Sequence, residues 1–159
     1  MPQEEYITIL VESLQKKNRI LDQIRAANEE QKILLADETL GPDAFEKTID
    51  RKAELIEELN QLDAGFEQIY ERVRPEIEQN MDKYAEKIRD MQGLITEIVE
   101  KTMSAQAEEM RNKQLIETKF SSVKKRIREV KSSQKAVNTY YKNMMKTGFI
   151  DSQFLDRKK

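Results

Sequence analysis

One long helical pattern constrains this chain more than any other feature of its sequence. Apolar side chains recur in alternating steps of three and four residues from Met81 to Ile98, and the pattern resumes from Ile116 to Met144. Such steps keep side chains on one face of an α-helix, and this face must pack against a partner. The segment contains no proline and a single glycine. The sequence therefore predicts one long helix over about 82–145.

The middle of this segment leaves a second interpretation open. Between Glu100 and Gln114 the apolar pattern gives way to a weaker series, Thr102, Ala105, Glu109 and Asn112. The two successive steps of four from Asn112 to Phe120 also shift the phase of the stripe. Either the helix continues while its packing partners change, or a fourth helix begins near Ser104. The absence of turn residues favours a continuous helix.

Two helices are expected before this segment, over about 4–36 and 43–79. The pair Gly41-Pro42 separates them, and Asp43 can cap the second helix. A short connection implies that the two helices lie antiparallel. The apolar face of the first helix includes Lys17, Asn28 and Gln31 at core-type positions, where a polar side chain either sets the register or meets a gap or solvent. The face of the second is predicted to contain Phe45, Ile49, Ala53, Ile56, Leu59, Phe66, Tyr70, Val73 and Ile77.

The composition favours an all-α fold and argues against catalysis. Of the 159 residues, 36% are charged and only four are glycine, too few for the turns of a many-stranded sheet. We expect a single helical domain over 1–159, built from an antiparallel hairpin and a long third helix. These helices form a three-helix bundle or coiled coil. A fourth helix is added if the chain folds back. No cysteine or histidine is present, so we expect no metal site, no cofactor, no catalytic residue and no enzymatic activity. An acidic start and short apolar runs predict a cytoplasmic protein without membrane insertion.

Charge is distributed unevenly along the chain. Residues 1–79 contain 10 Lys and Arg against 19 Asp and Glu, whereas residues 80–159 contain 18 against 11. This asymmetry favours pairing of the two halves or an acidic partner. The basic run Lys124–Lys131 is interleaved with core-type Ile127 and Val130 and lacks a base-reading face. We therefore do not expect nucleic-acid binding.

The predicted third helix is too long for the hairpin to cover. At about 1.5 Å per residue it would exceed the second helix by roughly 40 Å, so its end from about Phe120 would project. An exposed apolar stripe of this size usually has a use, which predicts a client-binding surface formed by Ile116, Phe120, Val123, Ile127, Val130, Val137 and Met144. Self-association into a homo-oligomer, or fold-back as a fourth helix, would also cover it. The tail over 149–159 contains four large apolar residues and either docks on a partner or packs on its own bundle.

Several segments together resemble the flagellar type III export chaperones of the FlgN/FliT kind. The similarity lies in Tyr6–Leu14, in Glu54–Leu59 of the predicted hairpin, in Tyr140–Met144 and in the closing Phe154–Lys159. An acidic hairpin, a long third helix with a basic end that bears tyrosines, and small size complete the likeness. The resemblance extends over essentially the whole chain.

The resemblance implies a cytoplasmic chaperone that holds a flagellar substrate protein, of the hook–filament junction or the filament cap, before export. It also implies that a tyrosine in the last helix docks on a component of the export gate. Tyr140 and Tyr141 both match this position, and the sequence does not choose between them. A client helix that is normally buried in a polymer needs a temporary apolar partner, which a helix-in-groove contact supplies.

Overall fold

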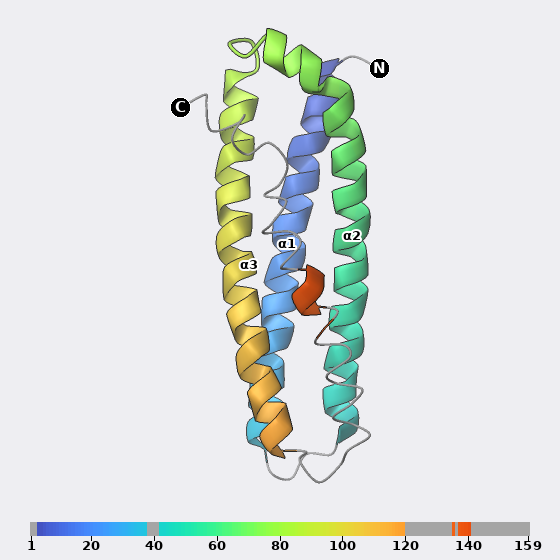
Figure 1. Ribbon diagram of the computed structural model, residues 1–159, viewed down its shortest axis with the longest axis vertical. Coiled ribbons are helices and arrows are strands. Elements are labelled where there is room, and N and C mark those ends of the chain that lie inside the picture. The colour runs from blue at the N-terminus through green and yellow to red at the C-terminus, as the bar shows by residue number, and fades with distance from the viewer. Residues whose placement is uncertain (1–2, 38–41, 120–134, 136, 141–159) are drawn as a thin grey trace.

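The computed structural model describes residues 3–37, 42–119, 135 and 137–140. These residues form three long helices, α1 (Gln3–Ala36), α2 (Pro42–Gln79) and α3 (Ala85–Lys119), and a short helical piece at 137–140. The long helices lie side by side in an elongated bundle (Figure 1). No strand occurs in the described part of the chain. The predicted all-α helical bundle is therefore confirmed.

The ends of the helices follow from local chemistry. Pro42 begins α2, where its missing N–H removes a donor that has no partner in the first turn, and the Asp43 carboxylate faces the positive end of the helix dipole. At the other end of α2, the Asn80 backbone N–H donates to the Ile77 carbonyl at 3.2 Å, and the Asn80 side chain donates to the Glu76 carbonyl at 2.9 Å. The Tyr84 hydroxyl donates to the Glu76 carboxylate at 2.8 Å across this turn. The chain thus reverses over 80–84 before α3 begins.

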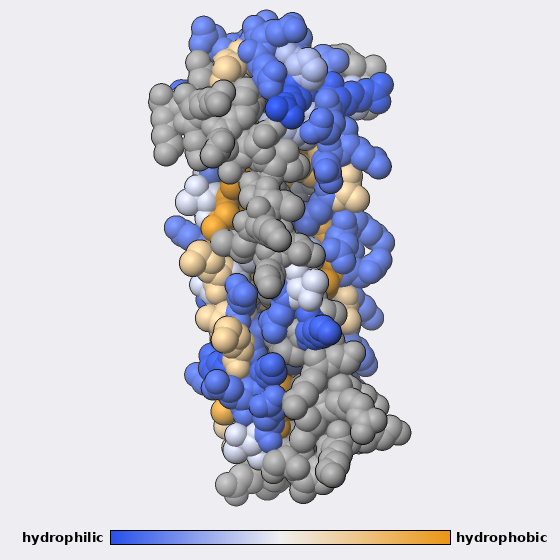
Figure 2. All heavy atoms as spheres, in the orientation of Figure 1, coloured by the Kyte–Doolittle hydropathy of each residue, from blue (hydrophilic) through white to orange (hydrophobic). Residues whose placement is uncertain are grey.

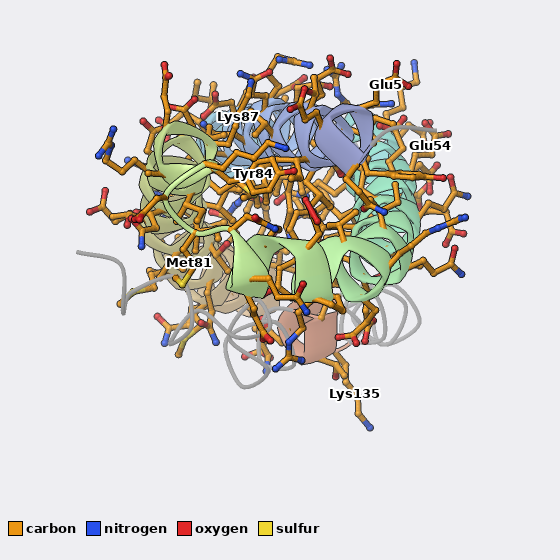
Figure 3. All side chains as sticks on the ribbon, turned by 90° about the horizontal axis from the view of Figure 1, so that it is seen from above. Glu5, Glu54, Met81, Tyr84, Lys87 and Lys135 are labelled. Carbon is orange, nitrogen blue, oxygen red and sulfur yellow. The ribbon has the colours of Figure 1, made fainter. Side chains whose placement is uncertain are left out.

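The helix α1 is the shared partner of the other two. It lies antiparallel to α2 and parallel to α3, as the Asn18–Glu97 and Arg25–Glu108 contacts between α1 and α3 show. No Cα atom of α2 lies within 8 Å of a Cα atom of α3. Seen from above, α2 and α3 lie on either side of α1, and the short helical piece lies on the side of the bundle opposite α1 (Figure 3).

The apolar core is divided into two parts of unequal size. The main cluster is formed by buried residues of all three helices, together with Val137. A small second cluster at the other end of the bundle contains Phe45 and Ile116, with Leu35 and Ile49 packed against them. Buried polar residues separate the two clusters.

The position of residues 137–140 corrects the expectation of a projecting third helix. A continuous helix would place Tyr140 roughly 30 Å beyond Lys119. Lys119 instead lies at the end of the bundle, where its ammonium contacts the Asp37 carbonyl at 2.5 Å, while Tyr140 contacts Asp63 in the middle of α2. The chain has therefore returned along the bundle by residue 135, which agrees with the fold-back alternative and not with a straight helix over 82–145. Burial of Val137 in the main core accounts for this position.

Candidate partner-binding site

The predicted client-binding residues are only partly within the described chain. Ile116 is 2% exposed and packs with Phe45, and Val137 is 6% exposed and belongs to the main core. Neither side chain forms a free surface in this conformation. The remaining predicted residues lie outside the described part of the chain: Phe120, Val123, Ile127, Val130, Met144 and, for the export gate, Tyr141.

Tyr140 is described, and it contacts the hairpin through a polar group. Its hydroxyl donates a hydrogen bond to Asp63 Oδ2 at 2.7 Å, and Lys17 Nζ lies 2.5 Å from Asp63 Oδ1. The Lys17 ammonium also lies 5.9 Å from the centroid of the Tyr140 ring. These three residues come from α1, α2 and the short helical piece, so they hold the piece on both helices of the hairpin.

The electrostatics of Lys17 reflect its burial. The residue is 2% exposed, and removal from water lowers the pKa of its amine to about 8. The adjacent Asp63 carboxylate opposes this shift through its charge and its hydrogen bond, but only in part. The sequence identified Lys17 as a core-type position, although its partner Asp63 was not predicted.

A buried polar layer connects the three helices between the two apolar clusters. Lys52 Nζ from α2 contacts both carboxylate oxygens of Glu109 from α3 at 2.6 Å, and it also donates to Asn28 Oδ1 at 3.0 Å and Gln31 Oε1 at 2.9 Å. The Asn112 amide donates to the Asn28 carbonyl at 2.9 Å. Burial lowers the pKa of Lys52, and the nearby Glu109 charge opposes that shift.

This layer corrects two details of the sequence interpretation. Asn28 and Gln31 do not meet solvent, because they are at most 1% exposed and hydrogen-bond to α2 and α3. Lys52 is buried in the position that Ala53 was expected to hold, and Ala53 is exposed. By residue type, lysine is rarely buried and alanine often is. The buried Glu109 carboxylate and the Asn28 and Gln31 side-chain oxygens pair with Lys52 and explain why it lies inside.

A groove lies between the outer flank of α3 and the short helical piece. It has a volume of about 680 Å³ and is lined by Gln106, Met110, Lys113, Gln114, Glu117, Lys135, Asn138 and Thr139. Met110 is 56% exposed, as is Met103 two turns earlier on the same flank. Figure 2 shows apolar patches among hydrophilic side chains on this face of the molecule. The helical pattern of the sequence does not reveal this groove, because its two walls meet only when the chain folds back.

The described residues contain no group of three or more acidic side chains that could hold a metal ion. No helix in the described part of the chain is long and apolar enough to cross a membrane. The described residues do present a polar contact that holds the terminal piece and an open groove.

Comparison with known proteins supplies the family. The family model described as FlgN protein matches residues 1–147. No curated protein and no solved structure is similar enough to this chain to match it. The match covers the three helices and the described part of the terminal piece, that is, nearly the whole chain. The chain therefore belongs to the FlgN family of flagellar export chaperones.

Proposed function

We propose that this protein is a cytoplasmic chaperone that binds one flagellar secretion substrate, a hook–filament junction protein or the filament-cap protein, and delivers it to the export gate. Membership of the FlgN family carries this proposal. An unassembled helix of an axial subunit needs a temporary apolar partner, which the apolar pattern from Ile116 to Met144 would supply.

The client surface that we propose is the stripe from Ile116 to Met144. Val137 is buried in the main core, so a client could reach it only after the terminal piece leaves the hairpin. Ile116 belongs to α3 and is covered by Phe45 of α2, so a client could reach it only if α2 also moved away at that end of the bundle. The contact of Tyr140 with Asp63 is part of what must open. A client helix would then replace apolar contacts that the protein makes with itself. When no client is present, those internal contacts keep the apolar surface covered.

Paired substitutions within the stripe test this surface. Phe120→Asp with Ile127→Asp should abolish capture of the flagellar substrate by the purified chain and leave the far-UV circular dichroism unchanged. Asn60→Asp with Gln61→Asp adds the same two negative charges at exposed positions of α2, away from the stripe and the groove, and should retain capture. Undiminished capture by the double variant would show that the client binds elsewhere.

For the export gate, we propose that Tyr140 or Tyr141 makes the docking contact. Tyr140 is held by Asp63, so its use at the gate requires the same opening as client binding. Tyr140→Ala and Tyr141→Ala should be compared separately in binding to the purified gate component. A loss confined to one variant identifies the docking tyrosine, and full binding by both variants contradicts the proposal.

A further inference from the structure

The groove beside Met110 carries a charge opposite to that of the whole chain. The chain has a formal net charge of −2, yet the residues that line the groove include two lysines, Lys113 and Lys135, and one carboxylate, Glu117. Glu117 already has an interaction of its own. No carboxylate of the described residues lies within ion-pair distance of either lysine. The groove is therefore a local basic surface on an acidic protein.

The groove also offers an apolar anchor. Met110 is 56% exposed in the groove wall, and Met103 is equally exposed seven residues earlier, which places both side chains on one flank of α3. Methionine side chains are flexible and polarisable, and they adapt to the shape of a docked apolar side chain. An exposed methionine on a helix otherwise rich in charged residues has no role in the core of the bundle.

We infer that this groove binds an amphipathic helix that places an apolar side chain on Met110 and acidic side chains beside Lys113 and Lys135. The inference rests on the proposed function in one respect, since it takes this helix from the exported subunit. It adds the chemistry of the partner: the groove selects for carboxylates along the flanks of the bound helix. The bound helix would lie against α3 and the terminal piece together.

The groove is separate from the stripe proposed above. Its wall contains Lys135, Asn138 and Thr139 in their present positions, so it exists while the terminal piece is docked on the hairpin. A helix can therefore bind here before the stripe is uncovered. This order would give the chaperone a first contact with its client that costs no rearrangement.

Two synthetic helical peptides test the charge preference. Each has leucine along one face, and the flanks are glutamate in one peptide and lysine in the other. Fluorescence anisotropy with the full-length protein should show binding of the glutamate peptide at least about tenfold tighter than that of the lysine peptide, a difference of about 1.4 kcal/mol. The net charge of the chain predicts the opposite order, so general electrostatic attraction cannot produce this result.

Charge reversal locates the site. Lys113→Glu with Lys135→Glu should reverse the preference, whereas Lys16→Glu with Lys87→Glu changes the net charge equally, away from the groove, and should preserve it. Met110→Asp should weaken binding of both peptides, whereas Met110→Leu, which keeps an apolar side chain at this position, should bind them as the wild-type protein does. Equal affinity of the two peptides for the wild-type protein, or reversal by the control pair, would overturn the inference.

Capture of a flagellar substrate is measured in parallel to separate the two proposals. A protein that captures the substrate but shows no preference between the peptides contradicts the groove alone. A protein that shows the preference but captures no flagellar substrate contradicts the proposed function and retains the groove as a peptide site.

Discussion

Lys52 and Glu109 show how far residue types alone predict a buried site. Asn28, Gln31, Glu109 and Asn112 all occur at core-type positions in the helical pattern, so their burial could be anticipated from the sequence. Their partners on the other helices could not, because these bonded residues are separated by 17 to 84 positions along the chain. Such pairs depend on the relative register of three helices. That register is a property of packing and is absent from the pattern of any one helix.

Removing one member of the buried ion pair should destabilise the protein strongly. Lys52→Met or Glu109→Leu alone leaves an uncompensated buried charge and should lower the free energy of unfolding by about 3–5 kcal/mol. The double variant should recover most of this loss, because no charge is then buried. Urea unfolding followed by circular dichroism measures the effect.

A surface ion pair provides the control for this experiment. Lys101→Met breaks the more exposed contact with Asp22 at 2.8 Å and should cost less than about 1 kcal/mol. If the Lys52→Met, Glu109→Leu double variant were as unstable as the less stable of the two single variants, the loss would not come from an unpaired buried charge.

Lys17 should make stability depend on pH in the alkaline range. Its pKa is about 8 in the folded protein, against 10.5 for an exposed lysine. Between these values the unfolded chain binds more protons than the folded one. The free energy of unfolding of the wild type, relative to Lys17→Met, should therefore rise with pH, by at most about 1.4 kcal/mol per pH unit. Parallel pH profiles for the two proteins would contradict the lowered pKa.

At the scale of elements, local signals fixed the hairpin but not the return of the chain. The predicted helices over 4–36 and 43–79 compare with Gln3–Ala36 and Pro42–Gln79, because Gly41, Pro42 and Asp43 mark the break between them. No glycine or proline occurs between Gly93 and Gly148 to mark where the chain turns back. Burial of Val137 and the Tyr140 contact decide where the terminal piece lies, and these act across the bundle and leave no mark on the local sequence.

Tyr140→Phe should loosen the terminal piece without removing its ring. The variant loses the hydrogen bond to Asp63 but keeps the aromatic face near Lys17, which should cost about 1 kcal/mol. Amide hydrogen exchange at 137–140 should accelerate about fivefold. Tyr6→Phe, a hydroxyl deletion on α1, should leave exchange at 137–140 unchanged. Equal protection in Tyr140→Phe and the wild type would show that the hydrogen bond does not hold this piece.

At the scale of the whole molecule, the fold class followed from composition and periodicity, whereas the candidate sites did not. The groove and the Lys17–Asp63–Tyr140 contact both need the terminal piece to lie beside the hairpin. The stripe that suggested an exposed client surface is the same feature that allows the piece to pack on the bundle. An apolar pattern shows that a face is covered, but it does not say whether the cover is another protein or the chain itself.

A charged side chain in place of Val137 should expose the side of the bundle between α2 and α3 that the terminal piece covers. Val137→Asp places a carboxylate in the main core, so the terminal piece should detach while α1, α2 and α3 remain folded. Binding of the dye ANS should increase, with little change in far-UV circular dichroism. The exposed Thr139 offers the control, because Thr139→Asp should not raise dye binding. Unchanged dye fluorescence in Val137→Asp would contradict a covering role for this piece.

Both α2 and α3 pack on α1, and no Cα atom of α2 lies within 8 Å of a Cα atom of α3, so the width of the side between them depends partly on the residues of α1 behind it. Leu14, Leu21 and Ile24 of α1 are at most 1% exposed, and their volumes help to set how far apart the two flanking helices stand. A change of a single methyl group there would widen or narrow the opening from behind. The fit of the terminal piece against the hairpin would therefore change without altering any residue of the piece itself.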